Sequence, residues 1–131
     1  PVEIVKDKHS TMVRLWSYQG MYPVAEIRNA TYQQVENALG TLAETLPGGW
    51  LSDQVWVTLN SNLRSSVYLK NALVTTYKYK PLVGIIEMID PRGKSTYYDY
   101  DVHGRLKEIY IIEGGIKKLL QENEYKYYNE K

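Results

Sequence analysis

The stretch Tyr97-Tyr98-Asp99-Tyr100-Asp101-Val102-His103-Gly104-Arg105-Leu106 predicts two strands joined by a tight turn. Tyr98 and Tyr100 are two positions apart, so on an extended chain both rings leave the same side of the sheet. Asp101 can accept hydrogen bonds from backbone N–H groups at the head of a turn, and Gly104 can take a positive φ without steric cost. The chain is therefore expected to reverse between residues 101 and 105.

The composition is that of one globular domain with an unusual preference for tyrosine. The 131 residues include 13 Tyr and 3 Trp but no Phe, and the net charge is +1. Tyrosine buries its ring and keeps a hydroxyl for water, which suits a sheet with one packed and one solvated face. The near-zero charge gives no field that would attract nucleic acid. No apolar stretch approaches the roughly 20 residues that span a bilayer, so we also expect no membrane insertion.

The part of the chain before Thr31 predicts two short strands and little else. Residues 1–10 are polar and lack a period, so we expect them to fray. Residues 11–18 favour a strand, and residues 22–27 favour a short one. Pro23 stands near the start of the second strand, where a missing N–H does least harm, which predicts an edge position.

Helical periodicity follows in the next part of the chain. Thr31 and Gln34 fit a capping box, and we expect Pro47-Gly48-Gly49 to end the helix that starts there. A second helix is predicted from Ser52 to about Ser65, although residues 55–58 would suit a strand as well. The apolar positions of the first helix recur at intervals of three and four: Val35, Ala38, Leu39, Leu42 and Ala43.

From Ala72 onward the pattern alternates and predicts an antiparallel meander. The predicted fold is α+β, with one or two N-terminal helices packed on that meander. We expect residues 1–131 to form a single domain, in which 1–71 are a strand plus a helical lead-in and 72–131 are the sheet. The predicted strands of the sheet are 73–79, 82–89, 95–101, 105–112 and 116–128.

Tyr-x-Tyr pairs recur in the sheet region. They begin at Tyr77, Tyr98 and Tyr125, so the second interval is somewhat longer than the first. The first interval, from position 77 to position 98, accommodates two short strands and two turns. Each unit is then one hairpin that buries its face by stacking on its neighbours.

The central unit resembles the YD repeat of the RHS family, whose pattern is roughly Tyr-x-Tyr-Asp-x-x-Gly-Arg-Leu. The first unit departs from that pattern, with Lys80 in place of Asp and no Arg-Leu after Gly84. Residues 22–27 and 71–77 resemble the segment that leads into the C-terminal YD repeats of Bacteroides-type surface or secreted proteins. The positions that fit are Tyr98, Tyr100, Asp101, Gly104, Arg105 and Leu106.

The resemblance implies a non-catalytic structural segment of a larger RHS-type protein, located at the cell surface or secreted. Its partners would be other segments of that protein. The chain begins on Pro1 without an initiator Met, which also favours a piece of something longer. The last strand leaves an outer edge, which the charges of Glu122, Glu124 and Lys126 would protect from pairing. If they do not, we expect that edge to pair with another copy as a homodimer.

Catalytic alternatives are weaker. Asp99 and Asp101, with Asp90, would suit an acid–base pair or a Ca²⁺ site, but a turn cap and a solvated strand residue are simpler. Asp90-Pro91-Arg92-Gly93 resembles the start of an RHS self-cleavage motif, yet Lys94 replaces its aromatic residue, so we interpret it as a turn. His9 and His103 are the only histidines and complete no triad or metal site. We therefore expect no enzyme, no cofactor and no metal.

The alternative function is a carbohydrate- or protein-binding module that uses exposed aromatic rings. Packing of these rings across neighbouring strands is the simpler explanation, because it needs no ligand. Asp101, Gly104 and Arg105 are interpreted as structural turn residues. The candidate binding residues are Tyr98, Tyr100, Trp16, Trp50 and Trp56.

Overall fold

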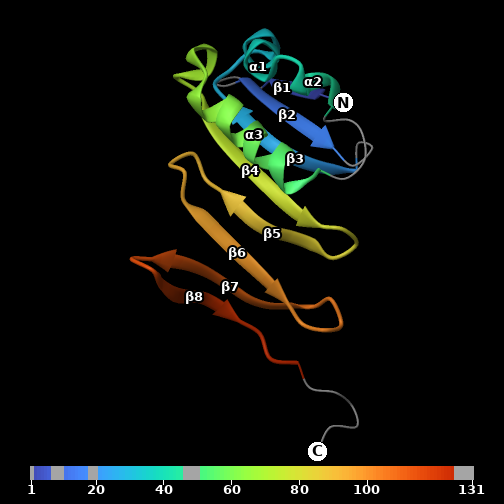
Figure 1. The fold of residues 1–131 in the computed structure, drawn as a ribbon, viewed down its shortest axis with the longest axis vertical. Coiled ribbons are helices and arrows are strands. Elements are labelled where there is room, and N and C mark those ends of the chain that lie inside the picture. The colour runs from blue at the N-terminus through green and yellow to red at the C-terminus, as the bar shows by residue number, and fades with distance from the viewer. Residues whose placement is uncertain (1, 7–10, 18–20, 46–50, 126–131) are drawn as a thin grey trace, which may run out of the picture.

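The computed structural model describes residues 2–6, 11–17, 21–45 and 51–125. Eight strands form one sheet in the order β1 to β8, and each is antiparallel to its neighbour in sequence (Figure 1). The strands are β1 Val2–Lys6, β2 Thr11–Ser17, β3 Tyr22–Arg28, β4 Leu73–Lys80, β5 Gly84–Ile89, β6 Ser95–Tyr100, β7 Leu106–Glu113 and β8 Ile116–Glu122.

The helices lie mid-chain between β3 and β4, and the prediction that they are N-terminal to the sheet is wrong. They are α1 Tyr32–Leu39, α2 Leu42–Thr45, α3 Asp53–Ser65 and the 3₁₀ turn η1 Val67–Leu69. The predicted capping box is confirmed: the Thr31 hydroxyl accepts from the N–H of Gln34, and the Gln34 side chain accepts from the N–H of Thr31. Ser52 caps α3, which confirms helix over residues 55–58.

Three local predictions are wrong, each because of pairing or a backbone angle that the sequence pattern did not reveal. Residues 2–6 form a strand, since pairing with β2 uses backbone groups and needs no side-chain period. The strand with Pro23 is interior, because β4 pairs with it only from Ala25 onward and spares the proline. The first helix ends at Leu39, where Gly40 takes φ 60°, and not at Pro47.

Two strand ends also differ. β5 begins at Gly84 because Leu82, with φ 65°, belongs to the preceding turn. β8 ends at Glu122, whereas we predicted a strand to residue 128; residues 126–128 lie outside the described part of the chain.

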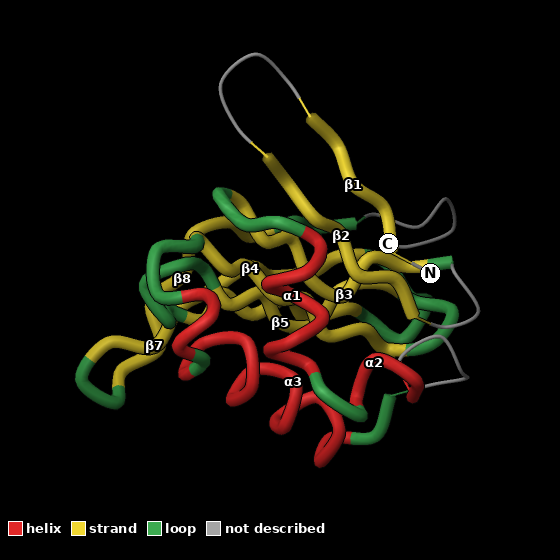
Figure 2. Tube along the Cα trace, turned by 90° about the horizontal axis from the view of Figure 1, so that it is seen from above, coloured by secondary structure: helices red, strands yellow, loops and turns green. Residues whose placement is uncertain are grey.

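The helices gather on one face of the sheet, over β2 to β4 (Figure 2). The core lies between the helices and the sheet. It includes Leu15 and Ile27 from the sheet and Leu59 and Leu63 from α3, all at most 1% exposed. No described helix is long and apolar enough to cross a bilayer.

Beyond β4 most of the sheet is a single layer among the described residues. The residues of β5 are half-buried throughout, those of β7 are half-buried or exposed, and those of β8 are all exposed. In Figure 1 these strands extend away from the helical end of the molecule. The chain thus has a conventional two-layer core at one end and an uncovered sheet at the other.

Candidate functional site

The uncovered sheet is built from hairpins that repeat one another in register. The β4–β5 pairs from Thr76↔Ile89 to Tyr79↔Ile85 recur in the β6–β7 hairpin as the pairs from Tyr97↔Tyr110 to Tyr100↔Leu106. This offset equals the interval from Tyr77 to Tyr98, which we call the tyrosine interval. Both hairpins also contain a one-residue β-bulge at the same place, with Ile86 and Lys107 as the extra residues.

The β2–β3 hairpin follows the same pattern, which the sequence period did not reveal. Its extra residue is Val24, and the pairing resumes at Trp16↔Pro23. Trp16 therefore stands where Tyr79 and Tyr100 stand in the later hairpins. The helices separate the first of three equivalent hairpins from the second.

Three tyrosine hydroxyls form a ladder of hydrogen bonds across these hairpins. Each donates to a backbone carbonyl near the start of a returning strand, and the three acceptors are equivalent in the repeat. Burial raises the pKa of Tyr100, and the nearby Tyr98 adds to that shift. The bonds run from Tyr79 to Pro23 at 2.6 Å, from Tyr100 to Ile85 at 2.7 Å and from Tyr125 to Leu106 at 2.6 Å.

Each ring of the ladder also lies beside the residue that precedes its carbonyl acceptor, and this residue is different in each case. Tyr22 stacks on Tyr79 with ring centroids 5.0 Å apart. The guanidinium of Arg105 lies 4.2 Å from the centroid of the Tyr125 ring. At the position between them, Gly84 has φ 148°, and a Cβ there would lie 2.8 Å from the Tyr100 hydroxyl oxygen. The ladder rings are thus engaged by packing as well as by hydrogen bonds.

Asp101 lies at the head of the β6–β7 turn. One of its oxygens accepts from the N–H groups of His103 and Arg105, and the other accepts from Arg105 Nε at 2.9 Å. These bonds lower the pKa of Asp101, and the bond from the Arg105 N–H contributes most to that shift. Gly104 has φ 77°. The predicted turn role of these three residues agrees with this geometry.

In the β5–β6 turn, Asp90 Oδ1 accepts the equivalent pair of hydrogen bonds, which come from the N–H groups of Arg92 and Lys94. The motif Asp90-Pro91-Arg92-Gly93 is therefore a turn with the same hydrogen bonding as 101–105. Within the described residues, no group of three or more acidic or histidine side chains is arranged to hold a metal ion.

The remaining aromatic candidates do not form a common platform. Trp56 is 6% exposed, and its indole N–H donates to the Tyr77 carbonyl. Trp16 is half-buried in β2, Tyr98 is half-buried in β6, and Trp50 lies outside the described residues. Sequence reasoning missed another aromatic contact, the stack of Tyr97 on Tyr110 with ring centroids 5.3 Å apart.

Lys117 also contacts the Tyr110 ring. Its ammonium lies 4.4 Å from the centroid of that ring and 3.0 Å from Glu108 Oε1. Tyr110 therefore packs against both Tyr97 and a lysine.

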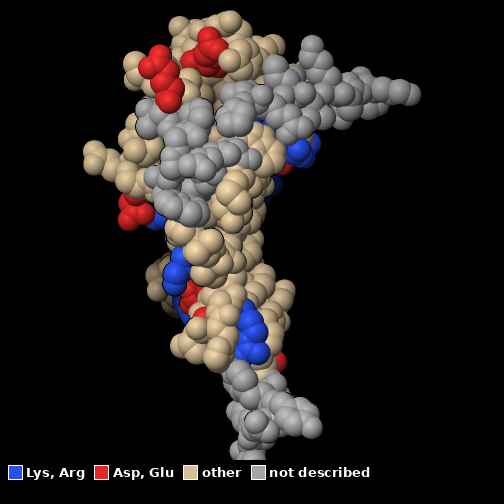
Figure 3. Space-filling model, turned by 90° about the vertical axis from the view of Figure 1, so that its right-hand side faces the viewer, with Lys and Arg blue, Asp and Glu red and all other residues tan. Residues whose placement is uncertain are grey.

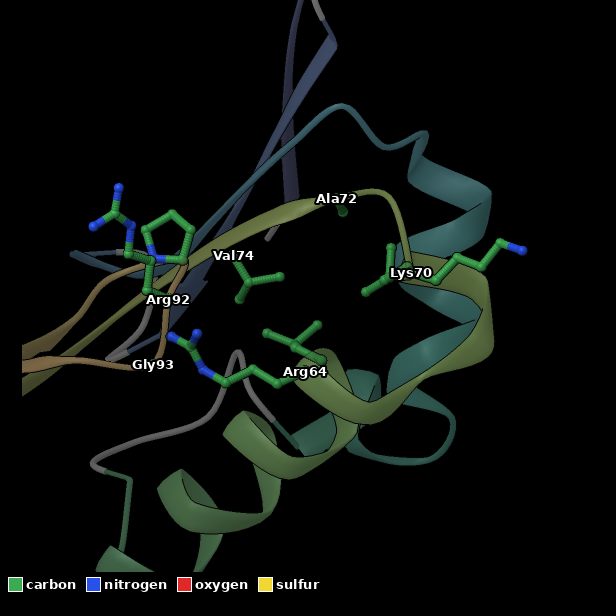
Figure 4. Close-up of a pocket in the computed structure, with 9 residues that line it drawn as sticks. Arg64, Lys70, Ala72, Val74, Arg92 and Gly93 are labelled. Atoms are coloured by element: carbon green, nitrogen blue, oxygen red, sulfur yellow. The ribbon is translucent and has the colours of Figure 1, made fainter.

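A pocket of about 320 Å³ lies between α3, η1 and the β5–β6 turn. Its lining includes the apolar side chains of Leu63 and Val74, whereas the side chains of Lys70 and Arg92 point away from it (Figure 4). The cations therefore do not converge on one point, as an anion site would require.

Arg64, on the pocket wall, is used to join elements. Its guanidinium donates to Asn60 Oδ1, Thr76 Oγ1 and the carbonyls of Ile89 and Asp90, at 2.8 to 3.2 Å. Burial lowers its pKa. The arginine thereby ties α3 to β4 and to the turn that follows β5.

Charges on the side of the molecule shown in Figure 3 are mixed, and small groups of Lys and Arg lie beside groups of Asp and Glu. No family model matches the chain, and no curated protein sequence matches it.

Proposed function

We propose that this chain is a non-catalytic structural segment of a larger RHS or YD-repeat protein at the cell surface or outside the cell. In this role the hairpins pack against other segments of that protein. The observation that carries the proposal is the recurrence of strand pairing and bulge at the tyrosine interval, together with the tyrosine ladder.

A repeating register is what an extendable array requires. In such an array each hairpin buries its faces and edges mainly against neighbouring units. Strands β5 to β7, whose residues are mostly half-buried, fit that description, because they have neighbouring strands on both sides and, in the described part of the chain, most of their length has no layer above or below.

The use of the aromatic rings favours this proposal over a carbohydrate-binding module. Sugar stacking needs a ring face that is open to solvent, whereas Trp56 is buried. Tyr79 and Tyr100 each donate their hydroxyl to the backbone of a neighbouring strand. These contacts stabilise the sheet whether or not a ligand is present.

An insertion in phase with the repeat tests the proposal. A second copy of residues 84–104, placed between Gly104 and Arg105, adds one complete repeat unit. Because the register then continues unchanged, we expect a folded chain with more strand signal in circular dichroism and cooperative unfolding.

The matched control is a copy of 85–104 at the same place, which lacks one residue of the unit, breaks the register and sends side chains to the wrong face. We expect this control to unfold at markedly lower urea concentration. Equal loss of structure in both variants would refute an extendable array. A glycan array in which binding disappears on Tyr98→Ala, with the fold intact, would support the carbohydrate alternative instead.

A further inference from the structure

The last strand of the sheet, β8, has no neighbouring strand on its outer side among the described residues. It extends over Ile116–Glu122 without a proline, and all its residues are exposed. Long unpaired edges of this kind readily pair with another strand. Two leucines near its middle, Leu119 and Leu120, are 45% and 56% exposed.

A bulge at Leu120 decides which side chains of β8 share a face. Lys117 lies opposite Ile112 on β7, and Glu122 lies opposite Glu108. From Glu108 to Ile112, beyond its own bulge at Lys107, β7 alternates regularly. Lys117 and Glu122 therefore lie on the same face although an odd number of positions separates them. By the same argument Lys118 and Gln121 share the other face.

This arrangement makes β8 complementary to itself when it runs antiparallel to a second copy. Pairing centred between Leu119 and Leu120 sets Lys117 opposite the second copy's Glu122, twice, and the two side chains of each such pair lie on the same face. Lys118 then meets Gln121, and the leucines meet one another. A two-fold axis perpendicular to the sheet relates the two copies, as in closed dimers.

Glu122 gains most from such a contact. Within its own sheet it lies directly opposite Glu108, and like charges opposite each other on adjacent strands destabilise a sheet. Lys117 already pairs with Glu108, yet its side chain is still 46% exposed. In the dimer each Lys117 would lie between its own Glu108 and the second copy's Glu122.

We infer that β8 is a self-recognition edge through which two copies form an antiparallel, two-fold symmetric dimer with one continuous sheet. The inference goes beyond the proposed structural role and does not depend on the RHS resemblance. The insertion of a repeat unit lies before Arg105, so failure of that test leaves the dimer test intact.

Sedimentation equilibrium of the whole chain tests the dimer. Glu122→Lys places two lysines opposite each other at both ends of the interface, and Lys117→Glu does the same with two glutamates. We expect either change to weaken dimerisation by about tenfold or more, because two attractive pairs become repulsive. Mixing the two variants restores two opposite-charge pairs, so we expect a mixed dimer close to the wild-type strength.

Lys118→Glu is the matched control, since it makes the same charge change on the next residue but faces Gln121. It should dimerise like the wild type, and thermal melts should show that all variants remain folded. A wild-type chain that stays monomeric up to about 1 mM would overturn the inference. An equal loss of dimer strength in the Lys118→Glu control, or no recovery of the dimer when the two charge variants are mixed, would also overturn it. Open polymers would overturn it as well, because they would indicate that β8 pairs with β1 of the next copy.

Discussion

At the scale of single residues, Asp101 shows how a short side chain can define a hairpin. It satisfies two backbone N–H groups and a guanidinium at once, and Asp90 repeats the backbone part of that pattern in the previous turn. Each carboxylate acts in its charged form. The turns should therefore be sensitive to protonation.

The pH dependence of stability tests this view of Asp101. Because its pKa in the folded chain is lowered, its contribution is present above the unfolded value near 3.8 and is lost as the pH falls through the lower folded value. We expect Asp101→Asn to lower the melting temperature at pH 7 and to cost progressively less below about pH 4. Asp99→Asn, on the exposed strand position two places earlier, is the control. If Asp101→Asn lowered the melting temperature equally at pH 7 and below about pH 4, the role of Asp101 as a charged acceptor would be contradicted.

Arg64 is the second residue whose role can be tested. Arg64→Met removes four hydrogen bonds and leaves buried acceptors such as Thr76 Oγ1 with fewer donors. We expect a loss of about 2 kcal/mol or more in the free energy of unfolding, measured by urea denaturation. Lys70→Met removes a charge from the same pocket wall without breaking a described hydrogen bond, and it should change stability little. If Arg64→Met and Lys70→Met lowered the free energy of unfolding equally, the hydrogen bonds of Arg64 would contribute nothing specific to stability.

At the scale of elements, much of the fold could be predicted because its signals are local. The capping box at Thr31, the cap at Ser52 and the turns at residues 90–94 and 101–105 all depend on a few neighbouring residues. The positions of β1 and β3 could not be predicted in this way. They depend on which distant strand pairs with them, and pairing through backbone groups leaves no mark on side-chain type.

The candidate site was predictable to a similar degree. The tyrosine spacing revealed the repeat unit, but the hydroxyls donate to carbonyls, which every residue carries. The bulge residues Val24 and Ile86 are aliphatic but Lys107 is charged, so no side-chain type marks the bulge, and the equivalence of the first hairpin with the other two appears only in the register. Trp56 was expected among exposed rings, but it lies on the face of α3 that packs toward the sheet.

At the scale of the whole molecule, packing is distributed unevenly. The helices cover β2 to β4, whereas none of the other described elements forms a second layer over most of the sheet from β5 to β8, which relies on strand pairing, bulges and the tyrosine ladder. A region with few buried apolar contacts opens at lower free energy than a packed core. Stability should therefore fall along the sheet from its helical end toward β8.

Native-state hydrogen exchange measures that gradient directly. We expect backbone amides of β7 and β8 to exchange at least about tenfold faster than those of β3 and β4, which corresponds to roughly 1.4 kcal/mol less opening free energy. The measurement belongs in the Glu122→Lys variant, because dimerisation through β8 would itself slow exchange at that edge. In the wild type at high concentration the same amides of β8 should gain protection while those of β3 do not change. Uniform protection across the sheet of the variant would show that the hairpins unfold as one unit with the core, and that the single-layer region needs no neighbour to be stable.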